Sequence, residues 1–135
     1  ARASRWLLDN DGDREAFLRH GRDLGRQLRR LASVVEGDVA CGSPEEADRI
    51  ARALVEQHLA ACTQRWEVRS LYRWRREVAQ APEWLLSFRT LEERIGDLER
   101  AVREHHAYEL PVLSFRVPRR LGLEARLWVE GCCTP

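Results

Sequence analysis

The segment from Cys62 to Trp74 constrains the fold more than any other part of the sequence, because its residues alternate in character. Even-numbered positions carry most of its aromatic and apolar side chains, whereas odd-numbered positions are mostly charged. Alternation over this length predicts a β-strand with one covered face and one solvated face. A second apolar run, Trp84 to Phe88, follows a polar segment, Arg75 to Pro82. We therefore predict one long β-hairpin within residues 62–90.

The predicted hairpin exceeds the usual strand length of about five or six residues and should protrude from its own domain. Its outer edge offers unpaired N–H and C=O groups, which favour pairing with another chain. The hairpin either extends freely into water or contacts another chain, and we expect the second arrangement.

Two capping boxes mark the helices that flank the hairpin. Ser43 and Glu46 frame the first box, and apolar residues follow at helical spacing as far as Val55. Thr90 and Glu93 frame the second box. The helix after the second box must end before Pro111, because the residue preceding a proline disfavours helical geometry.

A strand candidate lies outside each helix. Val34 to Cys41 precedes the first helix, although Glu36-Gly37-Asp38 interrupts its apolar pattern, and Val112 to Val117 follows the second. The order strand, helix, hairpin, helix, strand predicts an α+β fold with a ferredoxin-like βαββαβ split sheet. The helices would cover one sheet face, and the protruding hairpins of sister subunits would cover the other.

The ends of the chain are expected to differ from this domain, which we place at residues 38–130. Residues 1–37 are predicted to form a helical extension with a narrow apolar seam. This helix either docks a partner protein or nucleic acid, or packs on its own domain or a neighbouring subunit. Residues 131–135, with Cys132 and Cys133, are predicted to be a flexible tail, and Leu121 to Trp128 a short helix or an edge strand. The seam consists of Phe17, Gly21, Leu24, Leu28, Leu31 and Val35.

The composition excludes several classes of function. All 23 basic residues are arginines, so Schiff-base lysine chemistry is excluded, and a net charge of +1 gives no global attraction for nucleic acid or membrane. No apolar run approaches the roughly 18 residues that a membrane span requires. No phosphate loop, G-x-S-x-G or H-E-x-x-H motif is present. We expect a cytoplasmic protein with free thiols that is not an enzyme.

Cysteines are the candidate metal ligands in this sequence. Cys62 begins the hairpin, and a thiolate there could bind Cu(I) or another soft metal, although a free cysteine is also a common core residue. The vicinal pair Cys132-Cys133 could chelate a thiophilic metal or become oxidised, or it is incidental. None of the cysteines shows the C-x-x-C spacing of a structural zinc site.

Several short motifs occur along the chain in a definite order: Ser43 to Ala47, Leu59 to Cys62, Ser70 to Trp74, Phe88 to Thr90 and His105 to Pro111, followed by Trp128. Together they resemble the CutA family. Members of that family are trimeric ferredoxin-like proteins, are linked to divalent-cation tolerance, can bind copper and have an architecture similar to PII signalling proteins. The resemblance covers residues 38–130 and implies a homotrimer built through the long hairpin.

The resemblance also implies a cleft between subunits, lined by Tyr72, Trp74, Glu83, His106 and Tyr108. A carboxylate beside an imidazole can orient a metal ligand or relay a proton. With Cys62, the pair Glu83 and His106 gives the predicted metal set. Each residue also has an ordinary structural explanation: Glu83 could end a strand, His106 could close a helix, and the two hairpin aromatics could be interface packing.

The sequence therefore predicts a CutA-like homotrimer that contributes to divalent-cation tolerance, with copper or another divalent ion as its ligand. Two alternatives stay open at this point. One is a PII-like signalling or scaffold module that binds a small anion through arginines in the intersubunit cleft. The other is a scaffold whose ligand site has decayed.

Overall fold

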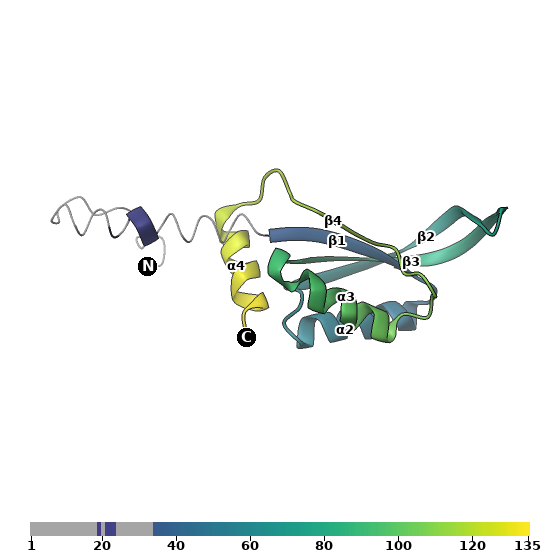
Figure 1. The fold of residues 1–135 in the computed structure, drawn as a ribbon, viewed down its shortest axis with the longest axis horizontal. Coiled ribbons are helices and arrows are strands. Elements are labelled where there is room, and N and C mark those ends of the chain that lie inside the picture. Colours follow the sequence, from purple (N-terminus) through teal and green to yellow (C-terminus); the bar gives the residue numbers. More distant parts are fainter. Residues whose placement is uncertain (1–18, 20, 24–33) are drawn as a thin grey trace. The chain divides into compact units, whose positions relative to one another are not determined.

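The computed structural model describes Arg19, residues 21–23 and residues 34–135 (Figure 1). The chain divides into two units, Ala1–Ala32 and Ser33–Pro135. Most of the predicted N-terminal helix lies outside the described residues, but Arg19 and residues 21–23 are helical and exposed. Val35, which we assigned to the apolar seam of that helix, belongs instead to the first strand of the second unit.

Residues 34–135 contain a four-stranded antiparallel sheet with strand order β2-β3-β1-β4. The helices α2 and α3 lie together on one face of this sheet (Figure 1). This arrangement confirms the predicted βαββαβ ferredoxin-like fold. The elements are β1 (Val34–Cys41), α2 (Pro44–Glu56), β2 (Cys62–Trp74), β3 (Glu77–Leu91), the short 3-10 helix η2 (Glu92–Arg94), α3 (Ile95–His105), β4 (Leu113–Arg116) and α4 (Leu123–Cys133).

The long hairpin is formed by β2 and β3, which extend beyond the helices at one end of the sheet (Figure 1). The prediction that the polar segment from Arg75 to Pro82 connects the two strands is wrong. The strand β3 already begins at Glu77, which pairs with Trp74 of β2. Only Arg75 and Arg76 join the strands, with φ angles of 47° and 70°. Two consecutive positive φ values characterise the type I′ turn, whose twist matches that of paired strands.

The two faces of β2 have different neighbours. Arg65 forms an ion pair with Asp48 of α2 at 2.6 Å, so the charged, odd-numbered set faces the helix side. The even-numbered aromatic set therefore lies on the face away from the helices, because successive side chains alternate between faces. Trp66, Tyr72 and Trp74 are 47, 40 and 48% exposed there, so a single chain leaves this aromatic face largely uncovered.

The strand β1 is continuous, and the polar residues that seemed to interrupt it have partners on the open face. Glu36 accepts a hydrogen bond from Arg89 at 3.0 Å, and Asp38 accepts one from Arg116 at 2.7 Å. Gly37 lies against the Phe88 ring, where an added Cβ would be 2.5 Å from a ring carbon. The segment is therefore an ordinary strand with one apolar face, one ion-paired face and a glycine that makes room for an aromatic ring.

The second predicted capping box does not form. Thr90 belongs to β3, is buried, and donates its hydroxyl hydrogen to the carbonyl of Leu59 rather than capping a helix. The helix α3 begins after η2, and no side chain caps it. The hydroxyl is used instead to join β3 to the chain that leaves α2.

The helix α4 corrects the prediction of an unstructured tail from residue 131. It continues through Cys133, and its Val129 and Cys133 are buried against Val34 and Leu91. The helix does not end at Gly131, because Cys133, one turn after Val129, is buried in the same apolar cluster. Of the two structures considered for residues 121–128, the helix is the correct one.

Replacing the Arg75-Arg76 turn by Asn-Gly should stabilise the protein. Left-handed backbone costs a side chain with Cβ about 1–2 kcal/mol, and Asn-Gly is the preferred type I′ pair, so we expect a gain of about 1 kcal/mol in the free energy of unfolding. Urea denaturation followed by circular dichroism would measure it. An Ala-Ala turn removes the same two charges but keeps both Cβ atoms, and should give no gain. Equal stability of the two variants would contradict this account of the turn.

Candidate functional site

A buried cluster of three potential metal ligands lies where β1, α2 and the segment after α3 meet. One ligand atom each from Cys41, Glu46 and His106 lies within 4.8 Å of the other two. Cys41 is fully buried and Glu46 is 2% exposed. The His106 side chain is also inaccessible to solvent. Of the predicted metal set, only His106 belongs to this cluster.

Glu46 is held by backbone N–H groups from two separate segments. Ser43 caps α2 as predicted, since its hydroxyl accepts a hydrogen bond from the Glu46 N–H at 3.1 Å. The Glu46 carboxylate does not return to Ser43 to complete the box. It accepts hydrogen bonds from the Gly42 N–H at 2.7 Å and from the Ala107 N–H. The carboxylate therefore ties the start of α2 to the segment that follows α3.

The hydrogen bonds of His106 indicate the neutral tautomer with its hydrogen on Nε2. Nδ1 accepts a hydrogen bond from the Tyr108 N–H at 3.0 Å, and Nε2 donates to the Ala40 carbonyl at 2.8 Å. The Glu46 carboxylate is 3.4 Å from Nδ1, but this contact is an ion pair only if the imidazole is protonated. In this tautomer the single lone pair of Nδ1 is used by the Tyr108 N–H.

The thiol of Cys41 is strongly disposed to keep its proton in the absence of a cation. Burial, followed by the negative charges of the nearby Glu46 and Glu83 carboxylates, raises its pKa to about 12. Since 9.0 is the ordinary value, the thiol is neutral at physiological pH. A thiolate could form here only with a positive charge beside it.

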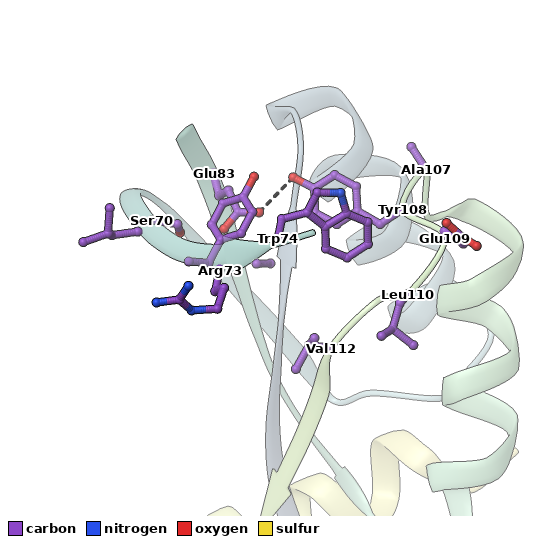
Figure 2. A pocket seen from close by; sticks show the side chains of 12 residues that line it. Ser70, Arg73, Trp74, Glu83, Ala107, Tyr108, Glu109, Leu110 and Val112 are labelled. Carbon is purple, nitrogen blue, oxygen red and sulfur yellow. Dashed lines mark hydrogen bonds between the residues drawn. The ribbon is translucent and has the colours of Figure 1, made fainter. Parts of the chain in front are cut away.

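An open pocket of about 820 Å³ lies next to this cluster, between the outer part of the hairpin and residues 107–112. Tyr108 donates its hydroxyl hydrogen to Glu83 Oε1 at 2.8 Å (Figure 2). Burial, followed by this hydrogen bond and the charge of Glu83, raises the pKa of Tyr108. The Tyr108 ring also lies across the backbone of Gly42, where an added Cβ would be 3.1 Å from a ring carbon. Tyr108 therefore connects the pocket to the buried cluster.

The predicted cleft residues Tyr72, Trp74, Glu83 and Tyr108 all line this pocket within one chain. Glu83 is 7% exposed, whereas the three aromatic residues are partly exposed. The structure thus brings together the residues assigned to an intersubunit cleft, with His106 one layer deeper. Whether a second subunit closes the cleft stays a prediction.

Cys62 lies far from the other members of the predicted metal set within one chain. It pairs with Arg89 in the sheet, whereas Glu83 pairs with Val68, six residues farther along β2. At about 3.3 Å a residue, this separation is about 20 Å. The Arg89 guanidinium donates a hydrogen bond to the Cys62 sulfur at 3.7 Å. Cys62 therefore belongs to the polar network on the open sheet face rather than to the buried cluster.

The accessory thiols Cys132 and Cys133 lie at the end of α4, and their backbone carbonyls have partners. His58 Nδ1 donates to the Cys132 carbonyl at 2.9 Å, and Arg94 Nε donates to the Cys133 carbonyl at 2.8 Å. The Cys133 side chain is buried, and burial raises the pKa of its thiol. The two sulfurs therefore have different surroundings, since Cys132 is partly exposed.

Sequence reasoning missed Cys41 and misjudged Glu46 as a helix cap alone. Both signals were available: Cys41 ends a strand, and Glu46 lies in the first turn of the helix that follows. The missing information was that residues 106–108 return across this junction. No spacing in the sequence reveals that return.

The comparisons with known proteins agree with this fold. A family model described as "CutA1 divalent ion tolerance protein" matches residues 38–126. The chain belongs to the CutA family. The resemblance inferred from short motifs is therefore confirmed, and the PII-like alternative is not favoured.

Individual CutA proteins share a moderate fraction of their residues with this chain. The divalent-cation tolerance protein CutA of Thermotoga maritima is 41% identical over 69 residues, which is 51% of this chain and 68% of the relative. That of Archaeoglobus fulgidus is 30% identical over 93 residues, or 68% and 90%.

Solved CutA structures superpose on most of this chain. The structure of CutA from Synechococcus elongatus has a TM-score of 0.73 at 28% identity, covering 76% of this chain and 92% of that one. A structure described as the periplasmic divalent cation tolerance protein CutA of Archaeoglobus fulgidus has a TM-score of 0.73 at 26% identity, covering 75% and 99%. Among the residues that the structure describes, no helix is long and apolar enough to span a membrane.

Thiol labelling should separate the buried and accessible cysteines. In variants that retain a single cysteine, Cys41 should react with a thiol reagent at pH 8 only after addition of denaturant, because it is buried and its pKa is about 12. The matched variant that retains Cys132 should react in the native state, since Cys132 is partly exposed. Rapid native labelling of Cys41 would show that the cluster is open to solvent.

Proposed function

We propose that this chain is a divalent-cation tolerance protein that acts by binding a metal ion, with Cys41, Glu46 and His106 as its ligands. The observation that carries the proposal is the meeting of a thiol, a carboxylate and an imidazole within 4.8 Å in a buried position. Thiolate and imidazole ligands suit copper and zinc better than hard cations such as magnesium. Copper or another thiophilic divalent ion is therefore the proposed ligand.

The surroundings of His106 fit a metal ligand. Metal-binding histidines usually donate their second ring N–H to a carbonyl or carboxylate, which fixes the tautomer. His106 makes this contact through Nε2 to Ala40, and Nδ1 is the nitrogen nearest Glu46. A metal at Nδ1 would replace the hydrogen bond from the Tyr108 N–H. The bound metal ion would supply a positive charge that stabilises the Cys41 thiolate.

The charge balance around the cluster also favours a cation. Glu46 and Glu83 are both buried, and both raise the pKa of Cys41. Among the described ion pairs, neither carboxylate is matched by an arginine, whereas Glu36, Asp38 and Asp48 each are. Hydrogen bonds from Gly42, Ala107 and Tyr108 offset part of the cost of burying these two carboxylates, but they supply no opposite charge. A bound metal ion would supply that charge.

We further propose that the protein acts as a homotrimer joined through the hairpin. The support is the exposed aromatic face of β2, because clustered exposed aromatic residues mark protein–protein contacts. The number three comes from the resemblance to the CutA family. A PII-like anion site receives no support from the pocket, whose lining holds two carboxylates, Glu83 and Glu109, and one guanidinium, Arg73.

Catalysis and location belong to the same proposal. The family description names a tolerance protein and no reaction, so we propose a binding protein rather than an enzyme. The four cysteines are free thiols, which supports a cytoplasmic location. The Archaeoglobus fulgidus relative is described as periplasmic, so cell fractionation is the direct measurement.

Metal titration tests the proposed centre. Calorimetric titration with Zn²⁺, and with Cu(I) against a competing chelator, should give one ion per chain in the wild type. Cys41→Ser should weaken binding by about tenfold to a hundredfold, because a hydroxyl is a poor substitute for a thiolate with these metals. Cys62→Ser is the matched control and should bind as the wild type does.

Two results would contradict the proposed metal centre. One is loss of metal binding in Cys62→Ser with binding intact in Cys41→Ser. The other is absence of metal binding by a wild type whose circular dichroism and melting curve indicate a folded protein. The same two measurements on Cys41→Ser separate a lost ligand from a lost fold.

Light scattering tests the assembly. The wild type should have three times the 15.7 kDa mass of one chain. Trp66→Glu should reduce this mass, because a charge on the aromatic face opposes burial there. Val78→Glu is the matched control, since Val78 is 64% exposed on the other face of the hairpin. A monomeric wild type would contradict the proposed trimer.

A further inference from the structure

We propose that the pocket beside the metal cluster binds a small organic cation, specifically a methylated ammonium group. This inference goes beyond the proposed metal centre and does not require it. The pocket combines a buried carboxylate, three aromatic side chains and apolar walls. That combination recognises a cation that is too bulky and too weakly hydrated to be a metal ion.

The carboxylate of Glu83 is the charged group at the inner wall of the pocket. Glu83 is 7% exposed, and its described hydrogen bond comes from Tyr108, a neutral phenol, through Oε1. None of the ion pairs of the described residues includes Glu83. Its second oxygen, Oε2, is thus available to a ligand, and a bound ammonium would supply the missing positive charge.

Aromatic rings surround this carboxylate. Figure 2 shows the Trp74 indole and the Tyr108 ring on the pocket side of their segments, with the Tyr108 hydroxyl directed to Glu83. Tyr72 also lines the pocket and is close enough to Tyr108 to raise its pKa. Cations are attracted to the faces of such rings, and indole attracts them most strongly. Trp74 already has the Arg75 guanidinium carbon at 5.8 Å from its ring centroid.

The remaining walls favour a methylated ammonium over a bare one. Leu110 and Val112 form part of the lining and are exposed, so apolar surface is available to methyl groups. The volume of about 820 Å³ falls within the range of about 300–1,000 Å³ that small-molecule pockets occupy. A divalent metal ion would need several oxygen or thiolate ligands at one point, and Glu83 supplies one carboxylate.

Arg73 does not neutralise the carboxylate. It lines the pocket, but its guanidinium points away from Trp74 and Tyr108 (Figure 2). No described ion pair joins Arg73 to Glu83 or Glu109. The buried Glu83 carboxylate therefore has no described cationic partner in the pocket, which favours a cationic ligand.

Choline and its neutral isostere 3,3-dimethylbutan-1-ol separate charge recognition from shape. The two molecules have the same size, and only choline is charged. Titration of the full chain, followed by tryptophan fluorescence and calorimetry, should give saturable choline binding. The alcohol should bind at least about tenfold more weakly, as expected for a loss of cation–π and carboxylate attraction. Sodium chloride at matched ionic strength should give no signal.

Two variants and two matched controls assign the effect to the pocket. Glu83→Gln keeps an oxygen that accepts the Tyr108 hydrogen bond, but should reduce the preference for choline over the alcohol to about one. Trp74→Leu should weaken choline binding about tenfold. Glu67→Gln and Trp84→Leu remove the same groups from the hairpin outside the pocket lining, on its helix-facing side, and should bind choline as the wild type does.

Equal binding of choline and the alcohol would overturn the proposal, because the pocket would then recognise shape alone. Absence of saturable choline binding below about 10 mM would also overturn it. Unchanged preference in Glu83→Gln would place the ligand elsewhere. Light scattering and metal titration on the same samples distinguish these failures from a failure of the trimer or of the metal centre.

Discussion

The hydrogen bonds to the Glu46 carboxylate are the interaction on which the site depends. Its oxygens accept N–H groups from Gly42 and from Ala107, so one buried side chain fixes the end of β1, the start of α2 and the segment after α3. His106 and Tyr108 flank Ala107, and their positions follow from this contact. The imidazole is thereby placed beside Cys41 and the phenol beside Glu83. The buried cluster and the pocket thus share one support.

The sequence predicted the fold well because its main signals are local. Alternation in residues 62–74, the Ser43 cap and the proline before β4 fix the type and order of the elements without reference to distant contacts. The predicted fold was wrong at positions where a residue typical of a helix end has a different role in the folded chain. Thr90 resembles a helix cap but bonds to Leu59, and Gly131 resembles a helix end but lies within α4.

The site was predicted only in part, because its assembly depends on contacts between distant segments. Tyr72, Trp74, Glu83 and Tyr108 were chosen through a family resemblance, and they do meet at one pocket. Cys62 was chosen because it begins the hairpin, but position along a strand does not reveal which residues lie near its two ends. Cys41 became a candidate only when the folded chain returned His106 to the end of β1.

The contacts of α4 have a mechanical consequence for the hairpin. His58 lies just before β2 and Arg94 just after β3, and each donates a hydrogen bond to a carbonyl at the end of α4. The end of α4 therefore links the start of β2 to the end of β3 at the base of the hairpin. Splaying of the strands at their base would break these bonds, whereas the distal half of the hairpin extends beyond the helices (Figure 1). Tyr72 and Trp74 lie on that distal half, so any bending of the hairpin there would change their position relative to Tyr108.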